Sequence, residues 1–125
     1  MLDSLSSYPA RRSARQRSAS PRICDHVIAL VARQKNVPVQ CLTHSRRNRL
    51  PIARARQLAM YLSHVVLGRS LMEIGEVFGR DRTTVSYACA LIEDMRDDPQ
   101  FDGEVTELER QIEAGMAATE VATHG

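Results

Sequence analysis

Residues 70–92, "SLMEIGEVFGRDRTTVSYACALI", constrain the fold more than any other stretch of the chain. Ser70 and Glu73 stand three residues apart, which is the spacing of a capping box at the start of a helix. Gly79 ends that helix, and Asp81 is a preferred N-cap for another. Apolar residues recur at helical spacing on both sides of the turn: Leu71, Ile74, Val77 and Phe78 before it, and Val85, Ala88, Cys89 and Ile92 after it. The sequence therefore predicts helices near 71–78 and 82–95.

Three positions in this stretch have the spacing of a helix-turn-helix. Gly75 stands where two such helices pack closest and side-chain volume must be small, Gly79 provides the turn, and Val85 packs between the helices. Core packing alone would also place apolar residues here. The combination with a capping box before it and a polar helix start after it favours a DNA-binding helix-turn-helix.

The rest of the chain also has helical periodicity. A first helix is expected near 22–35, ended by Asn36 and Pro38; "VPVQCL" is expected to add one or two turns. Pro51 suits the first turn of a helix that runs to Leu67, before Gly68. Apolar stripes support these helices and a last one with an acidic outer face, whose stripe we expect to close the core: Ile23, Val27, Leu30 and Val31; Ile52, Ala55, Ala59, Leu62 and Val66; Phe101, Val105, Leu108, Ile112 and Met116. Without any alternating β pattern or repeat, we expect an all-α fold, a small helical bundle with a helix-turn-helix.

The domain organisation follows from composition and charge. Residues 1–21 are rich in Ser, Arg and Pro and are expected to be a disordered basic arm, followed by a helix-turn-helix domain over 22–97. An acidic amphipathic helix over 98–118 and a disordered tail over 119–125 complete the chain. Residues 1–58 carry twelve Arg or Lys and two acids, whereas residues 59–125 carry five and thirteen. This asymmetry predicts a basic surface for a polyanion. Sixteen of the seventeen basic residues are Arg, which suits bidentate contacts with phosphate and guanine, although a GC-rich genome would produce the same excess of Arg over Lys.

Several classes of protein are excluded or disfavoured by what the sequence lacks. It has no apolar stretch long enough to cross a bilayer and no secretory signal, so we expect a cytoplasmic, nucleoid-associated protein without a membrane partner. The arginine- and serine-rich start has the composition of an organellar transit peptide, but Asp3 argues against that class. Cys24, Cys41 and Cys89 are far apart and the four histidines are unpaired in spacing, so no metal site is expected. No nucleophile–base pair or carboxylate pair suggests an enzyme, and no cofactor is expected.

The candidate contact residues lie at the start of the second helix. In a helix-turn-helix this end faces base edges in the major groove, which selects Asp81, Arg82, Thr83, Ser86 and Tyr87. Arg82 can bond guanine through two donors, Asp81 can accept from cytosine, and Thr83 can bond a base or contact a thymine methyl. Thr84 and the backbone amides can bind phosphate. For each residue the alternative is an ordinary solvated helix start, which we favour for Asp81, whereas for Arg82 and Thr83 we favour contact with a base or a phosphate.

The run "ARARQLAMYLSHVVLGRSLMEIGEVFGRDRTTVSYACALIE", residues 53–93, resembles the C-terminal DNA-binding domain of the bacterial replication initiator DnaA. That family pairs an "AR-RQ-AMYL" helix with "SL-EIG--F" and a recognition helix that opens "GRDHTTV---AC--I". The resemblance covers about residues 23–95 and implies a TrpR-like, DnaA C-terminal-domain-like fold that binds double-stranded DNA.

The resemblance also implies roles for basic residues outside the recognition helix. The minor-groove arginine of the family corresponds best to Arg47, with Arg46 and Arg49 beside it, and the phosphate-binding arginine corresponds to Arg56. Arg54, Ser70 and Arg80 border these positions and complete the candidate DNA-binding surface. This chain departs from the family by a turn one residue shorter and by Arg82 where the family has His. We therefore expect a base preference different from that of the initiator box.

Two functions from different classes remain open. The first is a stand-alone, sequence-specific DNA-binding protein that regulates transcription or replication initiation. It would lack the ATPase domain and bind no nucleotide, since the chain has no G-x-x-x-x-G-K-[ST] motif and Lys35 is its only lysine. The second is an adaptor that keeps the fold, has little DNA affinity and binds a protein partner through its acidic C-terminal helix.

Overall fold

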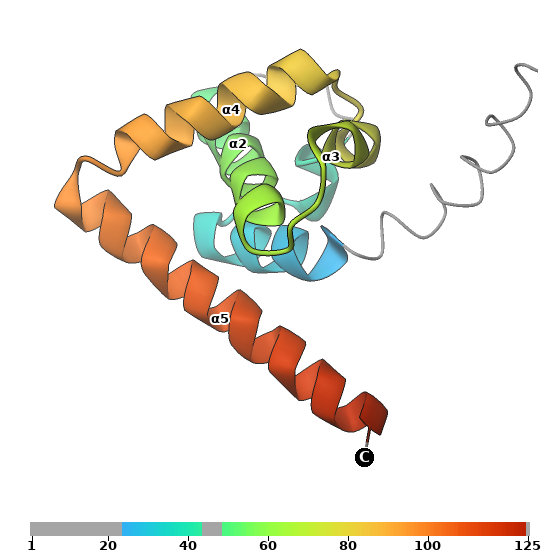
Figure 1. Ribbon diagram of the computed structural model, residues 1–125. Coiled ribbons are helices and arrows are strands. Elements are labelled where there is room, and N and C mark those ends of the chain that lie inside the picture. Colours follow the sequence, from blue (N-terminus) through green and yellow to red (C-terminus); the bar gives the residue numbers. More distant parts are fainter. Residues whose placement is uncertain (1–23, 44–48, 125) are drawn as a thin grey trace, which may run out of the picture.

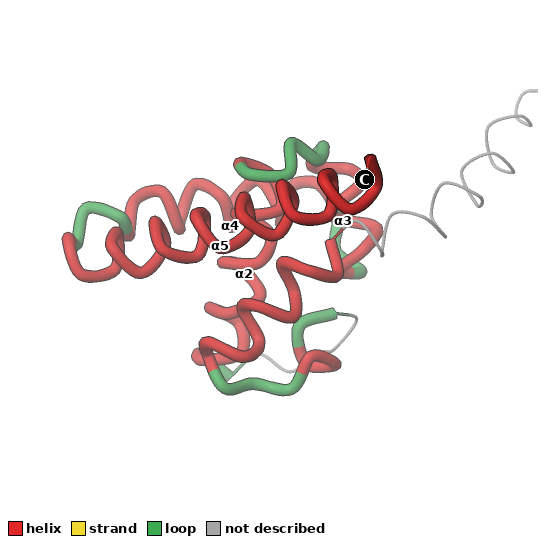
Figure 2. The backbone as a smooth tube through the Cα atoms, turned by 90° about the horizontal axis from the view of Figure 1, so that it is seen from below, coloured by secondary structure: helices red, strands yellow, loops and turns green. Residues whose placement is uncertain are grey.

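The computed structural model describes residues 24–43 and 49–124, with side chains described up to residue 117. The described residues form helices joined by short loops, without a strand, which confirms the all-α prediction (Figure 2). In chain order the elements are a first helix over 24–35, the 3₁₀ turn η1 (Val39–Cys41), α2 (Leu50–Val65), α3 (Leu71–Phe78), α4 (Arg82–Met95) and α5 (Pro99–His124). The basic arm expected over 1–21 lies outside the described residues.

The α3 and α4 helices have the bounds that the sequence predicted. Ser70 caps α3 in a capping box with Glu73, and Asp81 caps α4 by accepting a hydrogen bond from the Thr84 amide. Gly68 and Gly79 both adopt positive φ, of 71° and 66°, a conformation that glycine allows without strain. In the turn between α3 and α4, Gly79 thus ends α3 and Asp81 starts α4.

The angle between α3 and α4 depends on a close backbone approach at Gly75. The carbonyl oxygen of Arg80 lies where a Cβ on residue 75 would be, so the turn can pass this close to α3 only when residue 75 is glycine. The Arg80 amide donates to the Gly75 carbonyl at 2.9 Å and holds the turn there. Val85 is fully buried behind it, as predicted for the residue between the helices.

The core lies between α2, α4, α5 and the first helix. In Figure 1, α4 and α5 leave their connecting turn in a V, and α2 and the first helix lie between its arms. The last helix contributes Val105, Leu108 and Ile112 to the same buried cluster as Val27 and Val31 of the first helix. The expectation that the last helix closes the core is therefore confirmed.

The first helix and α5 run antiparallel to one another. Lys35, at the end of the first helix, forms an ion pair with Glu104 near the start of α5, with 3.3 Å between Nζ and Oε1. Near the other end of the pair, a Cβ at Gly115 would collide with the ring of His26. A small residue at 115 therefore lets α5 lie close against the first helix.

Arg96 joins three helices at the end of α4. Its guanidinium donates to Asp102 at 2.6 Å and Glu109 at 2.9 Å on α5, and to the Tyr61 hydroxyl at 3.0 Å on α2. Tyr61 in turn donates to Glu93 of α4 at 2.8 Å. Burial acts to lower the pKa of Arg96, but the hydrogen bonds to its acceptors outweigh this effect and raise its pKa above the ordinary value. The network fixes α5 relative to α2 and α4.

The structure corrects several details of the sequence interpretation. Leu71 and Cys89 are only half-buried, and Met116 is 44% exposed although it was assigned to the core. The helix expected to end at 118 continues to His124, and no Gly or Pro stands between residues 116 and 124 to end it earlier. The tail expected to be disordered over 119–125 is therefore helical over all but its last residue, which lies outside the described residues. None of the helices in the described part of the chain is long and apolar enough to span a membrane.

We expect Gly75→Ala to lower the free energy of unfolding by about 1–3 kcal/mol, because the new methyl group meets the rigid backbone of Arg80. Gly103→Ala is the matched control: nothing lies within 4 Å of its added Cβ on α5, so the helix should gain about 0.5–1 kcal/mol. Urea denaturation followed by circular dichroism measures both. Equal stability of Gly75→Ala and the wild type would show that the close approach does not restrict residue 75.

Candidate nucleic-acid interface

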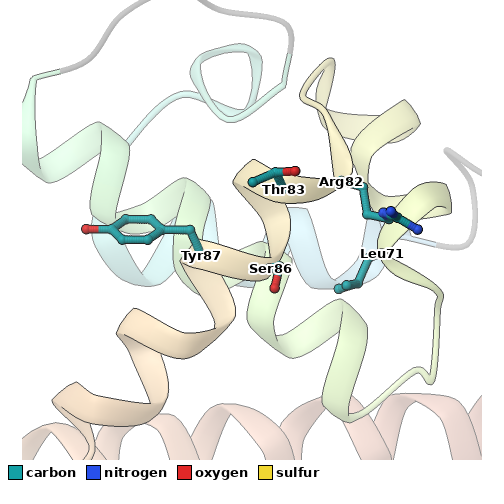
Figure 3. Close-up of a pocket in the computed structure, with 5 residues that line it drawn as sticks. All are labelled: Leu71, Arg82, Thr83, Ser86 and Tyr87. Atoms are coloured by element: carbon teal, nitrogen blue, oxygen red, sulfur yellow. The ribbon is translucent and has the colours of Figure 1, made fainter.

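An open hollow of about 450 Å³ lies at the start of α4 and is the candidate contact surface. It is lined by Leu71 of α3 and by Arg82, Thr83, Ser86 and Tyr87 of α4. Figure 3 shows Arg82 and Leu71 on one side of α4 and the Tyr87 ring on the opposite side. All four α4 side chains are exposed. Because they line one hollow, the structure brings together every residue assigned to base contacts except Asp81.

Asp81 has a structural role at the edge of this hollow. Its Oδ1 atom accepts a hydrogen bond from the Thr84 amide at 2.8 Å, and this bond is the main reason why the pKa of Asp81 lies below its ordinary value. One carboxylate oxygen thus caps α4. This agrees with the interpretation that Asp81 serves the start of the helix and not contact with a base. Thr84 is exposed beside it, with its amide already bonded.

Ser70 lies at the start of α3 and is also used locally. Its hydroxyl accepts from the Glu73 amide at 3.1 Å, and its own amide donates to Glu73 Oε1 at 3.0 Å. A hydroxyl that accepts one bond can still donate another, and Ser70 is exposed. Contact of Ser70 with a phosphate therefore stays compatible with its capping role.

Arg80 lies in the turn between the two helices and is half-buried. Its guanidinium donates to the carbonyls of Phe78 at 3.1 Å and Gly79 at 3.3 Å. These bonds hold its side chain against the turn that precedes α4.

The basic residues before α2 fall partly within the described structure. Arg46 and Arg47 lie outside the described residues, so the assignment of Arg47 to the minor groove stays a prediction. Arg49 is exposed at the N-cap of α2. Arg54 is half-buried and donates to Gln57 on the same helix at 2.9 Å.

Arg56, which the resemblance assigned to phosphate binding, is engaged inside the protein, and its contact with phosphate stays a prediction. The residue is only 4% exposed, and its guanidinium donates to the carbonyls of Leu42 at 3.2 Å and Cys41 at 2.8 Å. Burial, with the nearby positive charge of Arg80, lowers the pKa of Arg56. The structure therefore gives Arg56 an internal role: it caps the carbonyl groups at the end of η1 and holds that turn against α2.

Leu71 is the lining residue that the sequence interpretation missed. The apolar periodicity assigned Leu71 to the core, but it lies half-exposed in the hollow, and its neighbour Met72 is 60% exposed. Leu71 stands in the first turn of α3, and apolar periodicity identifies the apolar face of a helix but not where the element that covers it ends. Among residues 24–43 and 49–124, no three His, Cys, Asp or Glu side chains gather in a group that could hold a metal ion.

Comparison with known proteins gives one family match and several relatives. Residues 24–92 match the family described as "Bacterial dnaA protein helix-turn-helix". The chain is 44% identical over 94 residues to the chromosomal replication initiator protein DnaA of Zymomonas mobilis, covering 74% of this chain and 18% of that protein. It is also 44% identical over 89 residues to DnaA of Bartonella quintana, covering 70% of this chain and 18% of the relative. The chain thus spans about a fifth of the length of these relatives.

Solved structures have the same fold. The replication initiator DnaA bound to AMPPCP and single-stranded DNA superposes with a TM-score of 0.66 at 27% identity, over 87% of this chain and 33% of that one. A crystal structure of a DNA replication initiation factor gives a TM-score of 0.68 at 28% identity, over 88% of this chain and 33% of that one. The similarity extends beyond the residues that match the family and includes much of the remaining chain.

The capping role of Asp81 predicts a pH dependence of stability. The folded-state pKa lies below the ordinary value of 3.8, so the contribution of the cap is complete above that value and is lost as the pH falls through the lowered pKa. Asp81→Asn keeps a capping oxygen that does not titrate. Thermal unfolding of both proteins at neutral pH and near pH 3 should therefore show the wild type losing stability relative to Asp81→Asn on acidification. A difference between the two proteins that does not change with pH would contradict this role.

Proposed function

Because the chain belongs to the family of the bacterial DnaA helix-turn-helix, we propose that it binds double-stranded DNA sequence-specifically and regulates replication initiation or transcription. The N-terminal end of α4 reads base edges in the major groove, and the residues around it bind the phosphate backbone. The family is a helix-turn-helix, which supports the prediction that the matched residues are a binding module and not an enzyme. A protein acting on chromosomal DNA would be associated with the nucleoid.

The hollow at the start of α4 is the observation that supports this proposal most directly. It combines a guanidinium, two hydroxyl groups, a phenol and an apolar side chain, and its α4 side chains are exposed. These are the groups that distinguish base pairs in the major groove: bidentate donors for guanine, hydroxyl groups for either base type and apolar contacts for the thymine methyl.

The basic residues near the start of α2 provide the second half of the proposed footprint. Arg49 is exposed there, and Arg46 and Arg47 precede it in the sequence. We assign Arg47 to the minor groove and the exposed or half-buried arginines to phosphates. Arg56 supports this half by holding η1 in place, since its guanidinium bonds the Cys41 and Leu42 carbonyls just before the basic segment.

The wider role of the initiator is not part of the proposal. The chain spans 18% of the relatives' length, so of the initiator's own activity we assign to it only DNA binding, and the regulation proposed above would follow from that binding. The absence of nucleotide binding stays a prediction. The adaptor hypothesis also stays open, because the acidic face of α5 has the composition of a surface for a protein partner.

Fluorescence anisotropy with labelled duplexes tests DNA binding directly. A duplex with an initiator box, a duplex selected from a random pool and a scrambled duplex should bind with different affinities. If about four to six phosphates are neutralised, a plot of log affinity against log salt should have a slope of about −4 to −5. Equal and weak binding of all three duplexes would reject sequence-specific binding and favour the adaptor.

Arg82 should contribute both affinity and base preference. If its guanidinium bonds guanine O6 and N7, Arg82→Ala should cost about 1–3 kcal/mol of binding to the selected duplex and relax the preference at one base pair. Arg33→Ala is the matched control, since Arg33 is an exposed arginine on the first helix and its removal changes the net charge equally. Motifs selected by the wild type and by Arg82→Ala provide the readout. Identical motifs would show that Arg82 does not read bases.

A further inference from the structure

The exposed face of α4 changes its chemistry along the helix. Thr83, Tyr87, Ala90 and Asp94 follow one another at spacings of four, three and four residues, so they lie on one face, and all are exposed. Asp97 continues the same spacing into the turn after α4 and is exposed as well. The N-terminal end of α4 lies near α3, and its C-terminal end leads into α5 (Figure 1). At the first end this face carries the hydroxyl groups of Thr83 and Tyr87, with Arg82 on the side of the helix opposite Tyr87 (Figure 3). At the second end the face carries the carboxylates of Asp94 and Asp97.

The negative charge at the C-terminal end of α4 is not neutralised by the arginine beside it. Arg96 is the only Lys or Arg between residues 83 and 109, and it forms ion pairs with Asp102 and Glu109 of α5. Asp94, Asp97 and Asp98 remain exposed around it. This end of the helix is therefore net negative.

The two ends act separately on a charged ligand at physiological salt. Asp94 lies twelve residues after Arg82, which is about 18 Å along a helix axis. The Debye length under these conditions is about 8 Å, so the positive end does not offset the negative one. A duplex that approached the full length of α4 would bring phosphates of both strands near Asp94 and Asp97.

The charges inside α4 oppose its helix dipole, whereas the two residues that flank the helix, Asp81 at the N-cap and Arg96 at the C-cap, follow it. The α4 helix has no acidic residue in its first turn and no basic residue in its last, although the helix dipole favours acids at the start and bases at the end. Arg82 and Asp94 thus both occupy the less favourable end for their charge. The placement of these two side chains stabilises α4 less than the reverse placement would, which favours a role for them in contact with something outside the protein.

We propose, on the basis of the proposed DNA binding, that Asp94 and Asp97 are specificity determinants that act by repulsion. They keep phosphates away from the C-terminal half of α4, so a duplex is accepted only when α4 inserts by its N-terminal end. Nonspecific complexes include orientations in which α4 lies along the groove, and the carboxylates weaken these complexes more than the specific one.

The test compares two variants with the same change in net charge. Asp94→Asn/Asp97→Asn removes the repulsive pair, whereas Asp25→Asn/Glu113→Gln removes two exposed acids from the first helix and α5. Asp98 is left unchanged because it accepts a hydrogen bond from the Phe101 amide at the start of α5. Anisotropy titrations use the selected and the scrambled duplex, and thermal unfolding checks that both variants fold.

For Asp94→Asn/Asp97→Asn we expect affinity for the scrambled duplex to rise by about threefold to fivefold at physiological salt, with a smaller change for the selected duplex. The control variant should change neither affinity by more than about twofold. Equal gains on both duplexes, gains of the same size in the control, or no gain at all would each overturn the inference. If the wild type binds no duplex, the proposed function itself fails. That result is distinct from one in which the wild type discriminates between the duplexes and Asp94→Asn/Asp97→Asn discriminates equally well, which overturns only this inference.

Discussion

The contact between Gly75 and the Arg80 carbonyl determines the geometry on which the candidate interface depends. It brings the turn against α3, so α4 starts beside the first turn of α3 rather than away from it. Leu71 consequently lies in the same hollow as Arg82 and Ser86. A larger residue at 75 would displace the turn, and the two halves of the hollow would separate even if each helix stayed intact.

The α2 helix connects the two halves of the proposed footprint. Its first half buries Arg56, which bonds the carbonyl groups of η1, and its second half presents Tyr61 to the Arg96 network. In both interactions a polar side chain of α2 fixes a neighbouring segment, which is η1 in the first case and the end of α4 in the second. Arg49 at the N-cap of α2, η1 and the C-terminal end of α4 are in this way connected to one helix.

The parts of the structure that the sequence predicted are those determined by neighbouring residues. The start of α3 depends on Ser70 and Glu73, and the start of α4 depends on Asp81, so local capping chemistry was sufficient for the bounds of both helices. The burial of Arg56 was not predictable in this way. It depends on carbonyl groups 14 and 15 residues earlier in the chain, which no local pattern relates to an arginine.

The Arg96 network was missed for the same reason, since its partners include Tyr61, 35 residues away. Leu71 and Met116 were assigned to the core because periodicity identifies the apolar face of a helix but not where the neighbouring element ends. The sequence thus predicted which residues surround the start of α4, and the structure was needed to show which of them are already used inside the protein.

The antiparallel pairing of the first helix with α5 has a consequence for how the chain is synthesised. Val27 and Val31 are covered by residues near Val105 and Ile112, which the ribosome adds about 80 residues later. Throughout that interval the apolar face of the first helix lacks its partner, although the turn between α3 and α4 is already complete. Nascent chains that end before α5 therefore expose an apolar, aggregation-prone surface on the first helix, and the core of this protein is completed only after α5 has been synthesised.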